Sequence, residues 1–430
     1  MKIIKSILQS ILFITFSISF VYADGVVNPT LGKLIYSYQN GALGGGVVGY
    51  GITNDKNGNA YIAGYTNKAF AGQKQQGKMD YFLAKYNSNG QLLWLREVGG
   101  TNGYTQALGV TTGQLGNVYV TGDTSVGISG QPLNGQVDYF IAKYDSNGNL
   151  VWAKQVGKAN KQSAGFALSS DASNNFYITG ETNGGLFGQQ QNGLLDYFIA
   201  KYNSNGTLIW YHQVGASGGN SYAKSIVSNP NGDTYITGTT TKSISGQHQT
   251  GMLDYFIAKY DNNGQLTWSR QMGASNGSSV GFSVSDDVNN NVYITGTTSK
   301  GLFGNAQTGV NDYFAAKYDA TGNLIWGRQY GVKARSTVGS GIACNMYGNC
   351  FLSGQVVDTT NGNANYLIAR YDANGNLIWN TQVGNGGATS ANNVSLDSQG
   401  NAYLTGETDV PLNSQRQIGA YDYFIAKWQN

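Results

Sequence analysis

Asp196-Tyr-Phe-Ile-Ala-Lys-Tyr-Asn-Ser-Asn-Gly-Thr-Leu-Ile-Trp-Tyr-His-Gln-Val-Gly215 is the stretch that decides the fold, because it returns almost unchanged along the chain. Its seven copies begin at Asp80, Asp138, Asp196, Asp254, Asp312, Asn365 and Asp422. The first five copies follow one another at intervals of 58 residues, and the last two intervals are 53 and 57 residues. A period of this length is typical of an array of repeated supersecondary units.

Each repeat contains four candidate strands, which in the third full copy are residues 164–170, 175–180, 197–202 and 208–214. They are rich in β-branched and aromatic residues and are bounded by Asn and Gly. The turn Asn203-Ser-Asn-Gly206 joins the last two, and its glycine suits the positive φ of a hairpin. Large apolar groups occupy both faces of these strands, so each small sheet is expected to be covered on both sides.

Four antiparallel strands repeated seven times predict an all-β fold, a seven-bladed β-propeller. Asp196 and Lys201 fall on opposite faces of one strand, a placement that suits contacts between adjacent blades. Small residues of the first strand suit the crowded axis: Gly49, Gly109, Ala167, Ser225 and Ser283. Tryptophans of the fourth strand suit the wider gaps between blades at the rim: Trp94, Trp152, Trp210, Trp268, Trp326 and Trp379.

The two ends of the chain complement each other. Residues 32–39 match a fourth strand with no third strand before it, and the chain stops at residues 422–428, a third strand with no fourth after it. We therefore expect residues 33–39 to complete the last blade, so that pairing of the N-terminal strand closes the ring without a free sheet edge.

Residues 1–23 have the pattern of a signal peptide, with Lys2 and Lys5 at the start, a short apolar run and Ala23 before the expected cleavage point. The alternative is an uncleaved membrane anchor, which the short, Ser-interrupted run disfavours. We expect residues 24–430 to form a single propeller domain without a transmembrane segment. This domain would be secreted, periplasmic or held at the cell surface.

The charge pattern limits the partners. Lys and Arg number 26 and Asp and Glu 23, with no basic cluster, so a nucleic-acid partner is not expected. Turns such as Asp145-Ser-Asn-Gly148 resemble the start of a calcium loop, but no acid closes them, and the hairpin interpretation is favoured. We expect no metal, no cofactor and a monomer.

Two cysteines, Cys344 and Cys350, flank the turn between the first two strands of the sixth blade. They are expected to face each other across this hairpin and form a disulfide, which export would permit.

The pattern Gly-Asn-x-Tyr-Ile-Thr-Gly, a loop with Phe-Gly-Gln, then Asp-Tyr-Phe-Ile-Ala-Lys-Tyr and Asn-Gly-x-Leu-x-Trp resembles the SBBP β-propeller repeat of exported bacterial proteins, a relative of NHL repeats. The resemblance covers essentially residues 24–430. It implies a propeller and leaves the activity open. The sixth copy departs from the pattern at Asn365, Leu367 and Arg370.

The loops differ between the two faces of the expected disk. Connections from first to second strand and from third to fourth are tight turns, whereas the other two kinds are long and carry residues that vary between copies. The candidate ligand-binding residues on the long-loop face are Tyr65, Tyr104, Asp123, Lys161, Glu181, Tyr222, Arg335 and Glu407. The alternative is that most of them only solvate the loops.

The sequence favours a non-catalytic binding or scaffold module for a protein or glycan. The alternative is a propeller enzyme, a lyase or hydrolase, with its site at the channel mouth on the long-loop face. No catalytic residue is assigned, because His212 and His248 are the only histidines and neither is placed for catalysis.

Overall fold

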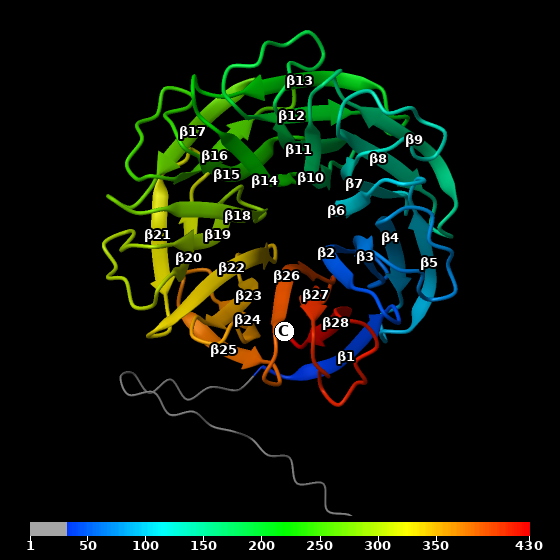
Figure 1. The fold of residues 1–430 in the computed structure, drawn as a ribbon. Helices are drawn as coiled ribbons and strands as arrows, with labels where there is room; N and C mark the ends of the chain where they lie inside the picture. The colour runs from blue at the N-terminus through cyan, green and yellow to red at the C-terminus, as the bar shows by residue number, and fades with distance from the viewer. Residues whose placement is uncertain (1–31) are drawn as a thin grey trace, which may run out of the picture.

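The computed structural model describes residues 32–430, which form seven four-stranded antiparallel sheets arranged in a ring around a central opening (Figure 1). The signal peptide predicted for residues 1–23 lies outside these residues. The predicted all-β, seven-bladed propeller is confirmed. Within blades 1 to 6 the chain runs from the inner strand to the rim.

Blades 1 to 3 follow one another along the chain. Blade 1 consists of β2 (Val47–Asn54), β3 (Ala60–Thr66), β4 (Asp80–Tyr86) and β5 (Leu92–Val98). Blade 2 consists of β6 (Thr105–Thr112), β7 (Val118–Thr124), β8 (Asp138–Tyr144) and β9 (Leu150–Val156). Blade 3 consists of β10 (Ser163–Ser170), β11 (Phe176–Thr182), β12 (Asp196–Tyr202) and β13 (Leu208–Val214).

Blades 4 to 6 continue the same order. Blade 4 consists of β14 (Ser221–Ser228), β15 (Thr234–Thr240), β16 (Asp254–Tyr260) and β17 (Leu266–Met272). Blade 5 consists of β18 (Ser279–Asp286), β19 (Val292–Thr298), β20 (Asp312–Tyr318) and β21 (Leu324–Tyr330). Blade 6 consists of β22 (Arg335–Cys344), β23 (Cys350–Asp358), β24 (Ala364–Tyr371) and β25 (Leu377–Val383).

Blade 7 is built from both ends of the chain. It consists of β26 (Thr389–Leu396), β27 (Ala402–Thr408), β28 (Asp422–Trp428) and β1 (Leu34–Gly41). β1 pairs with β28 in antiparallel register from Leu34 opposite Trp428 to Gly41 opposite Asp422. The predicted closure by the N-terminal strand is confirmed, and Figure 1 shows β1 as the outer strand beside β28.

Adjacent inner strands approach one another closely at one position of each strand. A Cβ atom on Gly109 would lie 2.9 Å from Cα of Ala167 in the next blade, so a small residue is required there. The same position is occupied by Gly51, not by Gly49, since Gly51 lies opposite Ala63 as Gly109 lies opposite Thr121. The assignment of Gly49 to this position was therefore wrong by two residues.

The tryptophans lie between blades at the rim, as predicted. Trp94 Nε1 donates a hydrogen bond to the carbonyl oxygen of Ser146 in the next blade at 3.2 Å, and Lys85 Nζ donates to the same oxygen at 3.1 Å. Trp152, Trp210, Trp268 and Trp326 make the same contact with the turn of the following blade. The indole group therefore fills the gap and also satisfies a turn carbonyl.

The repeated Asp-Lys pair has two separate structural roles. Lys201 Nζ reaches the turn of the next blade, where it donates to the carbonyl oxygen of Asn262 at 3.3 Å. Asp196 is fully buried and instead bonds within its own blade, accepting from the backbone of Asn192 and Gly193 and from Gln213 Nε2. The expected contact between blades is therefore correct for the lysine and wrong for the aspartate, which ties the long loop to the outer strand.

The short turns use their own polar groups. Gly206 has φ +76°, and Oδ1 of Asn203 accepts from the backbone N–H groups of Asn205 and Thr207 at 3.0 and 2.9 Å. In the turn of blade 2, Oδ1 of Asp145 does the same. These side chains close the hairpins, which supports the turn interpretation of the sequence.

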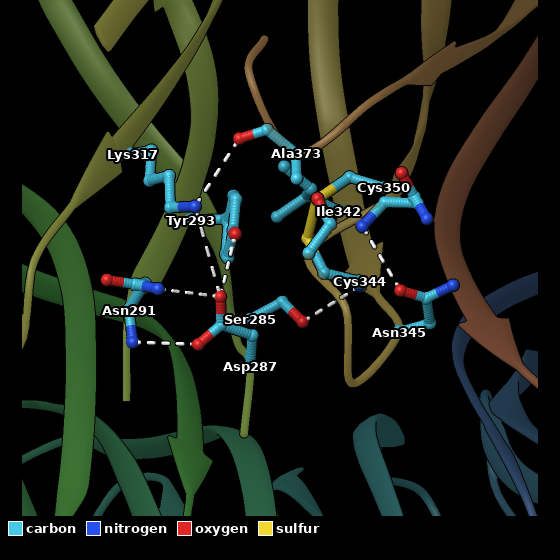
Figure 2. Close-up of a disulfide and its surroundings, with 12 residues drawn as sticks. Ser285, Asp287, Asn291, Tyr293, Lys317, Ile342, Cys344, Asn345, Cys350 and Ala373 are labelled. Atoms are coloured by element: carbon cyan, nitrogen blue, oxygen red, sulfur yellow. Dashed lines mark hydrogen bonds and ion pairs between the residues drawn. A yellow bond between two sulfur atoms is a disulfide. The ribbon is translucent and has the colours of Figure 1, made fainter. Parts of the chain in front are cut away.

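The predicted disulfide between Cys344 and Cys350 is confirmed. The two residues lie directly opposite each other at the short-turn end of β22 and β23 (Figure 2). The backbone N–H of Cys344 donates to Oγ of Ser285 in blade 5 at 3.0 Å, so the linked hairpin is also held by the preceding blade.

Candidate functional site

Seven side chains, one from the second strand of each blade, form a ring at the long-loop end of the channel. Each follows the glycine that ends the Tyr-Ile-Thr-Gly pattern and lies opposite the second residue of the inner strand, or the fourth in blade 6, whose inner strand begins two residues earlier. We call these residues the mouth ring: Tyr65, Asp123, Glu181, Thr239, Thr297, Gln355 and Glu407. The otherwise uniform blades thus differ here, which gives the channel mouth an individual chemistry.

Asp123 is buried beside two polar side chains of blade 2. Gln106 Nε2 donates to Oδ1 of Asp123 at 2.9 Å, and the Tyr104 hydroxyl also bonds to this carboxylate. Burial raises the pKa of Asp123 to about 6, although these two hydrogen bonds favour the ionised form, and the nearby Glu181 raises it further. Asp123 therefore titrates close to neutral pH.

Glu181 and Lys224 form an electrostatic pair across blades 3 and 4. Burial raises the pKa of Glu181 and lowers that of Lys224, and each group partly offsets the shift of the other. Lys224 Nζ lies 3.6 Å from the centroid of the Phe166 ring and 5.3 Å from that of Tyr222. One carboxylate oxygen of Glu181, Oε2, is buried without a hydrogen-bond partner.

Glu407 closes the other side of the mouth in blade 7. Asn392 Nδ2 donates to Oε2 of Glu407 at 2.5 Å and to the carbonyl oxygen of Gly49 at 3.0 Å. Burial raises the pKa of Glu407 to about 7, and the bond from Asn392 opposes this rise. The rings of Tyr50 and Tyr65 lie beside it with centroids 5.8 Å apart, and Tyr50 interacts with both Glu407 and Asp123.

A cavity of about 250 Å³ opens between blades 2 and 3 at this mouth. Its polar lining includes the carboxylates of Asp123 and Glu181, and the ring of Phe166 supplies an apolar face. The remaining lining residues are Tyr104, Gln106, Val137, Gln162, Ser163, Ala164 and Leu195. The combination of a few polar groups with an aromatic face is typical of small-ligand sites.

The structure brings six of the sequence-predicted residues to this mouth: Tyr65, Tyr104, Asp123, Glu181, Tyr222 and Glu407. The other two lie elsewhere on the loops. Lys161 lines a wider, open hollow of about 850 Å³ that also contains Phe187. Arg335 pairs with Asp358 at the ends of β22 and β23, with Nη2 and Oδ2 3.4 Å apart.

Sequence reasoning missed the partners that the inner strands supply. These are Tyr50, Gln106, Phe166, Lys224 and Asn392. Apart from Gln106, they share one position of the first strand, where the other blades carry Leu108, Phe282 and Ser340. The signal in the sequence is that this position of the first strand carries a different residue in almost every copy, as the long loops do.

No three His, Cys, Asp or Glu side chains of residues 32–430 are grouped so that they could hold a metal ion. The same part of the chain contains no helix long and apolar enough to cross a bilayer.

A family model described as the SBBP beta-propeller repeat matches residues 35–70, 267–304 and 378–413. The chain carries SBBP propeller repeats. Each matched SBBP segment begins in the outer strand of one blade and continues through the first two strands of the next blade, as β17 to β19 illustrate. The SBBP repeat therefore overlaps two blades, so each unit contributes to the contact between them.

Two curated proteins resemble this SBBP-repeat chain in sequence. An uncharacterised WD repeat-containing protein of Acanthamoeba polyphaga mimivirus is 24% identical, over 82% of this chain and 34% of its own length. The regulatory protein FlaEY of Caulobacter vibrioides is 25% identical, over 44% of this chain and 22% of its own length. The chain thus spans about a third or less of the length of these relatives.

A solved polysaccharide lyase, an ulvan lyase, shares 10% sequence identity with a TM-score of 0.49, covering 90% of this chain and 95% of that one. A likeness at this level concerns the propeller architecture only.

Proposed function

We propose that this protein is a binding module that recognises a neutral or basic saccharide at the long-loop mouth of its channel. The observation that carries the proposal is the cavity between blades 2 and 3, where buried carboxylates with amide and hydroxyl partners lie beside an aromatic ring. Carboxylates accept hydrogen bonds from sugar hydroxyl groups, and aromatic faces pack against the C–H surface of a sugar ring. A protein loop is a less suitable occupant, because the cavity is small and its polar groups are deeply placed.

The charge of the mouth supports the choice of saccharide class. Three carboxylates, those of Asp123, Glu181 and Glu407, face one ammonium group, that of Lys224. An acidic glycan would bring further negative charge next to them in a poorly solvated place, which is unfavourable. A neutral sugar or an amino sugar avoids this penalty.

The test is a binding screen of residues 24–430 against neutral, amino-containing and uronic oligosaccharides, followed by calorimetry with the best ligand. We expect Tyr104→Ala and Glu181→Gln each to weaken binding by about tenfold or more, a loss of about 1.4 kcal/mol. The first variant removes an aromatic side chain from the cavity lining, and the second replaces a carboxylate of the lining by an uncharged amide.

Ser146→Ala and Ser204→Ala in the short turns are the matched controls and should leave the affinity unchanged. Asn262 is unsuitable as a control, because its Oδ1 accepts a hydrogen bond from Tyr177. Weaker binding in the serine variants, with full binding in Tyr104→Ala, would move the site to the opposite face.

An enzyme with its site at the same mouth is the second candidate. It is favoured by the pKa values of Asp123, about 6, and Glu407, about 7, together with the lowered pKa of Lys224. A general acid or base is most efficient when its pKa lies near the pH at which the enzyme works. Incubation with the bound oligosaccharide distinguishes the two functions. New reducing ends or unsaturated products that disappear in Glu181→Gln would make the protein a hydrolase or lyase.

The proposed site requires access to external glycans, which agrees with the signal peptide predicted for residues 1–23. We propose that residues 24–430 act as an exported monomer. Cell fractionation combined with N-terminal sequencing of the product tests the export, and light scattering tests the monomer.

A further inference from the structure

The fourth strand of most blades places a glutamine next to the buried aspartate that opens the third strand. The position is set by register, with Gln155 opposite Phe140 and Gln213 opposite Phe198. In blade 3, Nε2 of Gln213 donates to Oδ2 of Asp196 at 2.8 Å, and its Oε1 accepts from the backbone of Leu186 at 3.2 Å. Gln39, Gln155, Gln271 and Gln329 make the same two bonds in blades 7, 2, 4 and 5.

Blade 1 has a glutamate at this position. Glu97 lies opposite Phe82 in the same register and therefore faces Asp80, the aspartate of its own blade. The side chain is 6% exposed and both of its carboxylate oxygens are buried, with the backbone N–H of Phe70 and the carboxylate of Asp80 beside them. Asp80 already accepts from the backbone of Gln76 and Gly77 at 2.5 and 2.7 Å, as its counterparts do.

Two ionised carboxylates at this place would repel each other in a site from which water is excluded. Glutamine avoids the repulsion because its amide donates to the aspartate. A glutamic acid can reproduce both glutamine bonds only when it is protonated: its O–H donates to Asp80, and its carbonyl oxygen accepts from the backbone of Phe70.

The electrostatic environment favours the protonated form. Burial raises the pKa of Glu97 to about 7; a backbone hydrogen bond from Phe70 lowers it, and Asp80 raises it. Among residues 32–430, Asp80 is the charged group that raises the pKa of Glu97, and no cation lowers this pKa in return.

The loop next to this acid pair bears on the closure of the ring. Loop 67–79 joins β3 to β4, and its Phe70 is buried, with its ring 5.3 Å from that of Phe82 and 6.1 Å from that of Tyr423 in blade 7. The Tyr86 hydroxyl of blade 1 also bonds to that of Tyr423. Loop 67–79 thus packs across the seam between blades 1 and 7, where the two ends of the chain meet.

We propose that protonated Glu97 donates a hydrogen bond to Asp80 and acts as a pH-sensitive latch, which holds loop 67–79 against the seam and releases it when Glu97 loses its proton to solvent. The other blades described above carry an amide at this position, which does not titrate. The device is therefore confined to one long loop, at the seam between blades 1 and 7.

The raised pKa of Glu97 determines how the stability of the closed loop depends on pH. A carboxyl group whose pKa is higher in the folded protein than in the unfolded chain stabilises the fold fully at acidic pH, and this contribution is lost as the pH rises through about 7. Because the pKa of Glu97 rises from its ordinary value of 4.5 to about 7, opening of the loop should become more favourable by well over tenfold between pH 5 and pH 8, with little further change at higher pH.

Hydrogen–deuterium exchange of residues 24–430 between pH 5 and pH 8 tests the latch. After correction for the intrinsic pH dependence of exchange, loop 67–79 should lose well over tenfold protection between pH 5 and pH 8 relative to loop 125–137 of blade 2. Glu97→Gln restores the residue of the other blades and should abolish this difference. An unchanged pH response in Glu97→Gln, or equal responses of the two loops in the parent protein, would overturn the proposal.

The reciprocal variant Gln155→Glu places a second acid beside Asp138 in blade 2. It should transfer the same pH-dependent loss of protection to loop 125–137. If this variant does not fold at neutral pH but folds at pH 5, the acid pair is again responsible. A variant that folds and shows no new pH response in loop 125–137 would contradict the latch.

Discussion

Deletion of residues 24–40 is expected to lower the melting temperature by about 10 °C or more and to make the protein associate. The deletion removes β1 except for its last residue and therefore exposes the edge of β28 along its length. It also removes Gln39, whose Nε2 donates to Asp422 and whose Oε1 accepts from the backbone of Leu412. Differential scanning fluorimetry and size-exclusion chromatography with light scattering measure the two effects.

The control is a deletion of residues 24–31, which leaves β1 intact. This variant should melt and elute like the complete residues 24–430. If the longer deletion also melts at the parent temperature and stays monomeric, β1 does not close the ring.

Asp196→Ala is expected to destabilise the protein by about 3 kcal/mol, because Asp196 is fully buried and its carboxylate is the acceptor of three hydrogen bonds. The donors are the backbone N–H groups of Asn192 and Gly193, at 2.8 and 2.6 Å, and Nε2 of Gln213, at 2.8 Å. Chemical denaturation followed by Trp fluorescence should show a lower midpoint, with the first loss of structure in loop 183–195.

The matched control is Asp261→Ala in the short turn of blade 4. Asp261 also accepts two backbone hydrogen bonds, from Asn263 and Gln265, but these groups are open to water. We expect a cost well below that of Asp196→Ala. Similar costs for the two variants would show that burial of the repeated aspartate is not what stabilises the blade.

The two structural predictions and the proposed functions concern different parts of the molecule. Asp196 and β1 hold the blades together, whereas the mouth ring and the residues around it provide the variable chemistry. A variant of the mouth such as Tyr104→Ala should therefore change ligand binding with a smaller change in melting temperature than Asp196→Ala, because Tyr104 is half-buried whereas Asp196 is fully buried.

The sequence alone was sufficient for the number of blades, the order of the strands, the closure by the N-terminal strand and the disulfide. Each of these depends on a short pattern repeated along the chain or on two residues that flank one turn, such as Cys344 and Cys350. It was also sufficient for six residues of the mouth, since Asp123, Glu181 and Glu407 stand out where the other copies carry uncharged residues.

Only the tertiary structure decided which side chains meet at the mouth and which acids pair inside a blade. A β-bulge in each inner strand, such as that between Gly49 and Gly51, adds one residue and changes which side chains face the channel beyond it. The error at Gly49 did not arise from the bulge, because the 58-residue period already leads from Gly109 to Gly51. Register together with ring closure brings Lys224 to Glu181 and Asn392 to Glu407. Glu97 looks like an ordinary polar residue in the sequence, and its contact with Asp80 emerges only when the fourth strand pairs with the third and removes both from water.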